Sequence, residues 1–156
     1  MYILLNVDLF DINYIYYHET QKNNIIKYSD FIRLCYCDNN MNMNGIYLEF
    51  ELNIHNIEYY ENKIINYFSF NNNEIILNKL KNIETDILNY MDLTNLDKSF
   101  SLYEKFKNNM IITANINKKQ NIKTIDTNTK FILKISGIWL SNKKFGLIYK
   151  IYSIYT

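Results

Sequence analysis

Lysines and aromatic residues alternate along the segment "KFILKISGIWLSNKKFGLIYKIYSIY", residues 130–155. With the two-residue period of a strand, Lys130 and Lys134 share one face, and so do Lys150 and Tyr152 on the following strand. Ammonium groups bind phosphates, and aromatic rings stack on unpaired bases. A pair of strands that carries both kinds of side chain therefore has the chemistry to bind a single-stranded nucleic acid.

The same chemistry extends to the turn of this hairpin and to earlier strands. Lys143 and Lys144 at the turn are placed to contact phosphate, although lysines are common in any exposed turn. Trp139 is either a stacking residue or part of the core, and Arg33 fits either a phosphate clamp or a buried ion pair. The predicted nucleic-acid-binding residues are Arg33, Tyr47, Lys130, Lys134, Trp139, Lys143, Lys144, Tyr149, Lys150 and Tyr152.

Catalytic patterns are sparse, and we expect no enzymatic activity, no bound metal and no cofactor. The chain has neither a phosphate-binding glycine-rich loop nor a serine in a nucleophile elbow. Asp30 together with Glu49 and Glu51 could hold Mg²⁺ in a nuclease. Two acids that alternate along a strand are, however, also typical of its hydrated side.

The two cysteines, Cys35 and Cys37, stand two residues apart in "RLCYC", which places both thiols on one face of a strand. His18 and His55 are the only histidines and lie far from them in the sequence, so the pattern disfavours a zinc site. Two reduced thiols are the favoured interpretation, and they fit an intracellular compartment.

Charge is divided unevenly along the 156 residues, which we expect to form a single domain, 1–156. Residues 1–97 contain fourteen acidic and six basic side chains, whereas residues 98–156 contain eleven lysines and two acids. The basic part indicates a polyanionic partner, docking onto the acidic part of another copy, or charge scattered over a solvated surface. A hydrophobic content of 48% argues against disorder, and no apolar run is long enough to predict a membrane span.

Two-residue periods predict mostly strands, including "SDFIRLCYC", "NGIYLEFELNI", "NIEYYENKIINYFSF" and "MIITANI". Residues 1–18 are expected to open the fold as a β-ribbon, and residues 117–130 to form a loop. Apolar residues three and four apart predict one helix over about 74–92, with Asn73 as its N-cap. The predicted fold class is mostly β or α+β: an OB-like β-barrel with one helix between strands, or alternatively a β-sandwich with one helix.

Two blocks, "FIRLCYC…MNMNGIYLEFEL" and "FILKISGIWLSNKKFGLIYKI", resemble paired blocks of small single-stranded DNA-binding proteins from large DNA viruses and related linear elements. The likeness lies mainly in residues 31–52 and 130–151, and Ser136, Gly137 and Trp139 belong to its more specific part. The resemblance implies a barrel that coats single-stranded DNA during viral or element replication and recombination. It also implies a location in the host cytoplasm or nucleus.

The sequence thus leaves three functions, of which one is favoured. The favoured function is non-catalytic binding of single-stranded DNA, with RNA as the other ligand, little sequence preference and a homo-oligomeric state. The second is a viral structural or assembly protein that self-associates through strands and opposite charges. The third is a small Mg²⁺-dependent nuclease.

Overall fold

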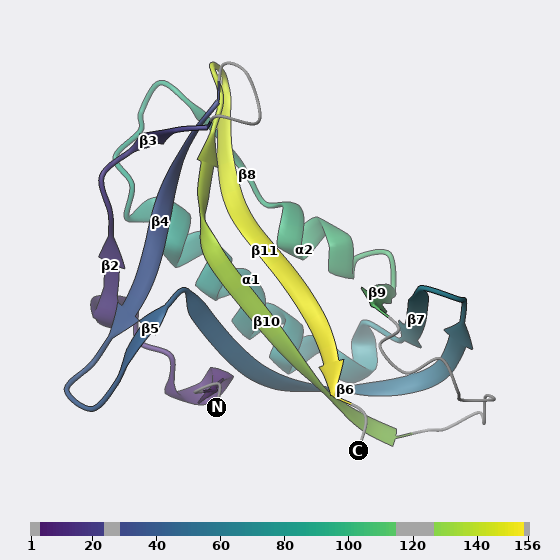
Figure 1. Ribbon diagram of the computed structural model, residues 1–156. Helices are drawn as coiled ribbons and strands as arrows, with labels where there is room; N and C mark the ends of the chain where they lie inside the picture. The colour runs from purple at the N-terminus through teal and green to yellow at the C-terminus, as the bar shows by residue number, and fades with distance from the viewer. Residues whose placement is uncertain (1–3, 24–28, 115–126, 155–156) are drawn as a thin grey trace.

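The computed structural model describes residues 4–23, 29–114 and 127–154, and in these residues one strongly curved sheet lies over two helices (Figure 1). The strands are β1 (Leu5–Asn6), β2 (Ile15–Tyr17), β3 (Gln21–Lys22), β4 (Asp30–Cys37), β5 (Asn42–Asn44), β6 (Ile46–Tyr59), β7 (Lys63–Phe68), β8 (Asp97–Ser99), β9 (Met110–Ala114), β10 (Thr127–Leu140) and β11 (Lys144–Ile154). The helices are α1 (Glu74–Asn89) and α2 (Ser101–Phe106), with 3-10 turns at Val7–Leu9, Ile12–Tyr14 and Asn71–Asn73. The mostly β, α+β fold class is confirmed.

The central strand of the sheet is β10, which has neighbours on both sides along its length. One side pairs with β6 as far as Ile135 and with β4 from Gly137 onward, while the other side pairs with β11. The register shifts between these two residues, as in a β-bulge. A Cβ atom on Gly137 would lie 2.3 Å from the carbonyl oxygen of Ile32, so glycine is what allows β4 to approach here.

The sheet stays open over the residues that the structure describes. From β10 it continues through β6 and β7 to β9. Thr113 Oγ1 of β9 lies 3.0 Å from Ser153 Oγ of β11, but no backbone ladder joins these two strands within the described ranges. The OB-like barrel, which would need such a ladder, is therefore not confirmed.

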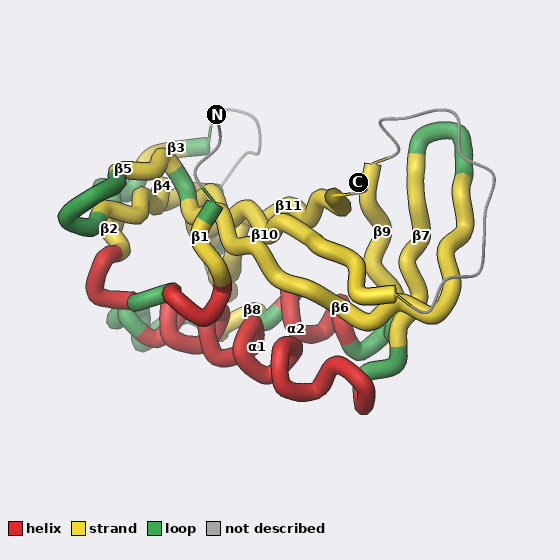
Figure 2. Tube along the Cα trace, turned by 90° about the horizontal axis from the view of Figure 1, so that it is seen from below, coloured by secondary structure: helices red, strands yellow, loops and turns green. Residues whose placement is uncertain are grey.

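Both helices cover the same face of the sheet, and the core lies between them and the strands (Figure 2). The buried stripe of α1 consists of Leu77, Leu80, Ile83, Glu84, Ile87 and Leu88. Phe50 of β6 stacks on Phe131 of β10 with ring centroids 5.6 Å apart, and Phe106 of α2 meets Phe50 edge-on at 6.4 Å. Burial of each phenylalanine contributes roughly 1.5–3 kcal/mol, so these rings help to hold the helices against the sheet. None of the described helices is long and apolar enough to cross a membrane.

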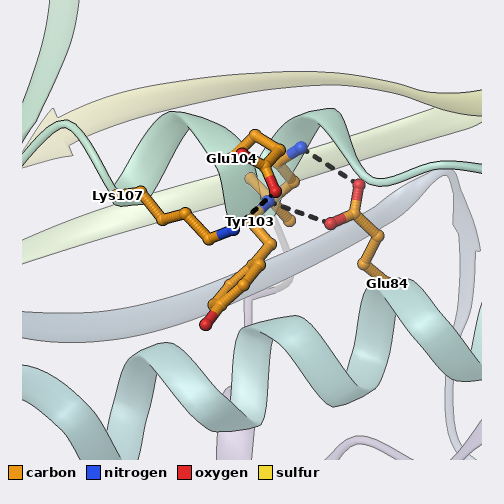
Figure 3. Close-up of polar contacts among 5 residues, drawn as sticks. Glu84, Tyr103, Glu104 and Lys107 are labelled. Carbon is orange, nitrogen blue, oxygen red and sulfur yellow. Dashed lines mark hydrogen bonds and ion pairs between the residues drawn. The ribbon is translucent and has the colours of Figure 1, made fainter.

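A buried carboxylate joins the two helices (Figure 3). Glu84 of α1 is fully buried and accepts the backbone N–H groups of Leu102 at 3.0 Å and Tyr103 at 2.9 Å. These donors lie at the start of α2, where the capping residue Phe100 makes no side-chain hydrogen bond. Burial raises the pKa of Glu84, while the two N–H bonds act in the opposite direction.

Several predicted boundaries are wrong. The expected strand over 56–70 is divided, because β6 ends at Tyr59 and β7 begins at Lys63. The opening segment forms short strands and 3-10 turns in place of a ribbon, since Asn6 and Asp11 accept backbone N–H groups two residues ahead. The strand β10 begins at Thr127, inside the predicted loop 117–130, while residues 115–126 of that loop lie outside the described residues. The predicted helix is confirmed but ends at Asn89.

Candidate nucleic-acid interface

One face of the sheet lies opposite the helices (Figure 2). On this face the register of β6, β10 and β11 aligns the side chains in three rows. The outer face, as we call it, consists of Tyr47, Glu49 and Glu51 of β6, Lys130, Ile132 and Lys134 of β10, and Lys150, Tyr152 and Ile154 of β11. The alternate residues of the same strands, such as Leu48, Phe131 and Ile151, are buried on the helix side. Directly opposed residues of paired strands point to the same side, so the register decides which groups meet.

One row of the outer face combines a ring with two ammonium groups. Lys134 is opposed by Tyr47 on one side and by Lys150 on the other. Its Nζ lies 5.2 Å from the centroid of the Tyr47 ring, which is within the range of a cation–π contact. In the neighbouring row, Ile132 is opposed by Tyr152. The structure therefore brings four of the predicted residues together on adjacent strands: Tyr47, Lys134, Lys150 and Tyr152. Their rings could stack on bases, and their ammonium groups could contact phosphates.

The other end of the outer face is a salt-bridge cluster. Lys130 Nζ lies 3.1 Å from Glu49 Oε1 and 3.8 Å from Glu51 Oε1. The hydrogen bond from Lys130 to Glu49 raises the pKa of the lysine, which stays charged and paired. A phosphate at this end would have to compete with two carboxylates. Lys130 is thus on the predicted surface, but its charge is already compensated within the chain.

The outer side of the sheet continues past the bulge to Arg33 and Trp139. Arg33 is exposed and opposed by Gly137, while Trp139 is half-buried and opposed by Phe31. A Cβ atom on Gly146 would lie 3.1 Å from Cζ2 of the Trp139 ring, so the ring rests against the backbone of β11. Trp139 consequently has a packing role on the side of the sheet where a stacking role was predicted.

Tyr149 does not belong to the outer face, which corrects its predicted role. Its side chain lies on the helix side of β11, where its hydroxyl donates to the carbonyl oxygen of Ser101 at 3.1 Å. Lys105 Nζ lies 5.8 Å from the centroid of the same ring. Burial raises the pKa of Tyr149. The tyrosine is one of alternating residues on β11, and its neighbours Lys150 and Ile148 point the other way.

Lys143 and Lys144 are exposed, as expected, but they lie apart from the outer face. The turn is closed by Ser141, whose Oγ donates to the carbonyl oxygen of Lys144 at 2.9 Å. Leu140, the last residue of β10, is six positions past Lys134, or roughly 20 Å at the rise of a strand. Lys143 and Lys144 could contact a nucleic-acid strand that runs on beyond the outer face, but they do not form one site together with Lys134.

The acids proposed for a nuclease are not brought together. Asp30 is opposed by Leu140 of β10, whereas Glu49 is opposed by Ile132, eight residues earlier on the same strand. That spacing corresponds to roughly 26 Å. In the described ranges no group of three or more His, Cys, Asp or Glu side chains is arranged to hold a metal ion.

The two-residue period places the acids beside Tyr47 and the isoleucines beside the lysines, but it did not predict that the acids pair with Lys130. Ile148 is 37% exposed and adds an apolar side chain beyond Lys150, on the same side of the sheet as Ile132 and Ile154. The pairing of Glu49 and Glu51 with Lys130 depends on the register between β6 and β10, which are far apart in the sequence. Comparison of the chain with protein-family models, curated proteins and solved structures finds no match.

Proposed function

We propose that this chain binds single-stranded nucleic acid on the outer face of its sheet, without catalysis. The observation that carries the proposal is the row of Tyr47, Lys134 and Lys150, in which a ring and two ammonium groups lie on adjacent strands. The resemblance of residues 31–52 and 130–151 favours single-stranded DNA as the ligand and viral or element replication as the setting.

The chemistry of this row fits an unpaired strand better than a duplex. Tyr47 and Tyr152 offer ring faces only to bases that are not already stacked, and every base has such a face. Lys134 and Lys150 are placed to follow the phosphates, and phosphate contacts make binding weaken as salt rises. Low sequence preference follows, because neither contact reads the edge of a base.

The test measures fluorescence anisotropy of a labelled oligo-dT of more than ~16 nucleotides, the upper site size of one OB-type domain, across a salt series. We expect Tyr152→Ala to weaken binding by roughly 5- to 150-fold, equivalent to about 1–3 kcal/mol per stacked base. Lys150→Ala should reduce the slope of log affinity against log salt by about 0.7, as for one single-strand phosphate contact.

Lys81→Ala is the matched control, because Lys81 is an exposed lysine of α1 on the opposite side of the sheet. It should leave both the affinity and the salt slope unchanged. The proposal is refuted if the wild-type chain does not bind oligo-dT at low salt, or if Lys81→Ala and Lys150→Ala weaken binding equally. An oligo-U and a duplex of the same length show whether RNA or paired strands are preferred.

Self-association is the second function that the sequence suggested, and one observation bears on its mechanism. Lys130 pairs with Glu49 and Glu51 of its own chain, so part of the opposite charge is already matched within one copy. A homo-oligomer that forms by strand addition would instead use β11, whose ladder with β8 covers only Lys144–Gly146. Light scattering without nucleic acid tests this, with salt-resistant assemblies expected for strand addition.

A further inference from the structure

A cysteine and a histidine that are distant in the sequence meet at the edge of the sheet. Cys35 of β4 is opposed by Tyr16 of β2, and His18 directly follows that short strand. The Nε2 atom of His18 lies 3.2 Å from Sγ of Cys35. The backbone N–H of His18 also donates to the carbonyl oxygen of Arg33 at 3.0 Å, which fixes the histidine backbone beside β4.

This pair lies on the side of β4 that faces away from the helices. Leu34 is opposed by Tyr17, whose hydroxyl donates to the carbonyl oxygen of Ile87 in α1, so that side of the strand is the helix side. Cys35 and its neighbour across the ladder, Tyr16, therefore point outward. Cys35 is half-buried and Tyr16 is 60% exposed, which leaves the thiol within reach of small reagents.

The position of the imidazole is defined by packing as well as by its backbone. The Tyr16 ring meets the His18 ring edge-on, with centroids 4.9 Å apart and planes at 90°. An imidazole nitrogen at hydrogen-bond distance can accept the thiol proton and hold the resulting charge next to sulfur.

The second cysteine provides an internal comparison. Cys37 lies two residues further along the same face of β4 and is also half-buried and free. Its Sγ donates to Oδ1 of Asn42 at 3.2 Å. A carboxamide oxygen accepts a hydrogen bond but does not take up the proton at neutral pH. The two thiols thus differ chiefly in whether their partner is a base.

We propose that Cys35 and His18 form a reactive thiol site that takes soft electrophiles, and in particular the disulfide of a low-molecular-weight thiol. The Cys35 sulfur attacks one sulfur of that disulfide, the S–S bond breaks, and a mixed disulfide forms on Cys35. His18 holds the proton that Cys35 gives up and passes it to the departing thiolate, so one molecule of free thiol is released. The site is independent of the proposed nucleic-acid binding.

The test labels the wild-type folded chain with a limiting amount of iodoacetamide at neutral pH and quantifies each cysteine by peptide mass spectrometry. Cys35 should be alkylated about tenfold faster than Cys37, because an unassisted thiol is only a few per cent ionised at this pH. Oxidised glutathione, used as the disulfide probe, should add one glutathione to Cys35 and none to Cys37.

Two histidine variants separate the base from general effects of substitution. His18→Asn should lower the Cys35 rate to that of Cys37 and leave the Cys37 rate unchanged, which also reports that the strand is still folded. His55→Asn, in an exposed histidine of β6, should change neither rate. Equal rates at the two cysteines of the wild type overturn the proposal without any variant. So does a Cys35 rate that survives His18→Asn.

Discussion

Glu84 offers the sharpest test of how the helices are held together. The change Glu84→Ala removes a fully buried carboxylate that accepts two backbone N–H groups, those of Leu102 and Tyr103. Leaving a buried donor without an acceptor costs about 1–3 kcal/mol each, and relief of the desolvated charge offsets part of that loss. We expect the free energy of unfolding to fall by roughly 2–4 kcal/mol.

Urea denaturation followed by circular dichroism measures this loss, and Glu104→Ala is the matched control. Glu104 is an exposed acid of α2 that pairs with Lys107 on the surface (Figure 3), so its removal should have little effect. Hydrogen exchange at the amides of Leu102 and Tyr103 should accelerate in Glu84→Ala but not in the control. Equal effects of the two substitutions would show that Glu84 does not hold α2.

The pH dependence of the free energy of unfolding provides an independent test of Glu84. Burial raises the pKa of Glu84 above 4.5, so between that value and the folded-state pKa the folded chain binds more protons than the unfolded chain. The stability from this group is fully present below pH 4.5 and is lost as pH rises through the folded-state pKa. Relative to Glu84→Gln, the wild type should therefore lose stability as pH rises through this window. A relative gain would contradict the assignment.

Three further substitutions test other parts of the structure. Gly137→Ala places a Cβ atom 2.3 Å from the carbonyl oxygen of Ile32, so the free energy of unfolding measured in urea should fall by about 1–3 kcal/mol or more. Ser136→Ala, at the neighbouring residue, should have little effect. Asn73→Ala removes hydrogen bonds to the backbone N–H and carbonyl of Asn53, at 2.7 and 3.1 Å, and should destabilise by about 2 kcal/mol or more, whereas the exposed Asn72→Ala should not. Glu49→Gln removes one of the two carboxylate charges that pair with Lys130, so it should tighten binding of oligo-dT at low salt and steepen its salt dependence. The exposed Glu61→Gln should change neither.

Local patterns predicted the individual elements well where one physical signal dominated. The alternation of β6 correctly separates Leu48 and Phe50, which are buried, from Tyr47 and Glu49 on the other side. Gly45, at the bend that enters β6, has a φ of 96°, a conformation that glycine adopts without strain.

Long-range pairing could not be predicted in the same way. Asn73 stands at the predicted start of α1, yet its side chain binds β6 and Ser69 and makes no capping bond, because β6 passes close to it. The contacts of Lys130 with Glu49 and of His18 with Cys35 likewise depend on which strands become neighbours. Nothing in the local sequence of either partner specifies that choice.

The central place of β10 has a consequence for the order in which the chain can fold. Ile32 of β4 is opposed by Ile138, a residue more than a hundred positions later in the sequence. Leu48 of β6 is likewise opposed by Leu133 of β10. During synthesis, β4 and β6 emerge from the ribosome long before β10, the strand with which both must pair. Their edges stay unpaired in that interval, so we expect slow, non-local folding and a nascent chain that depends on chaperones to avoid aggregation.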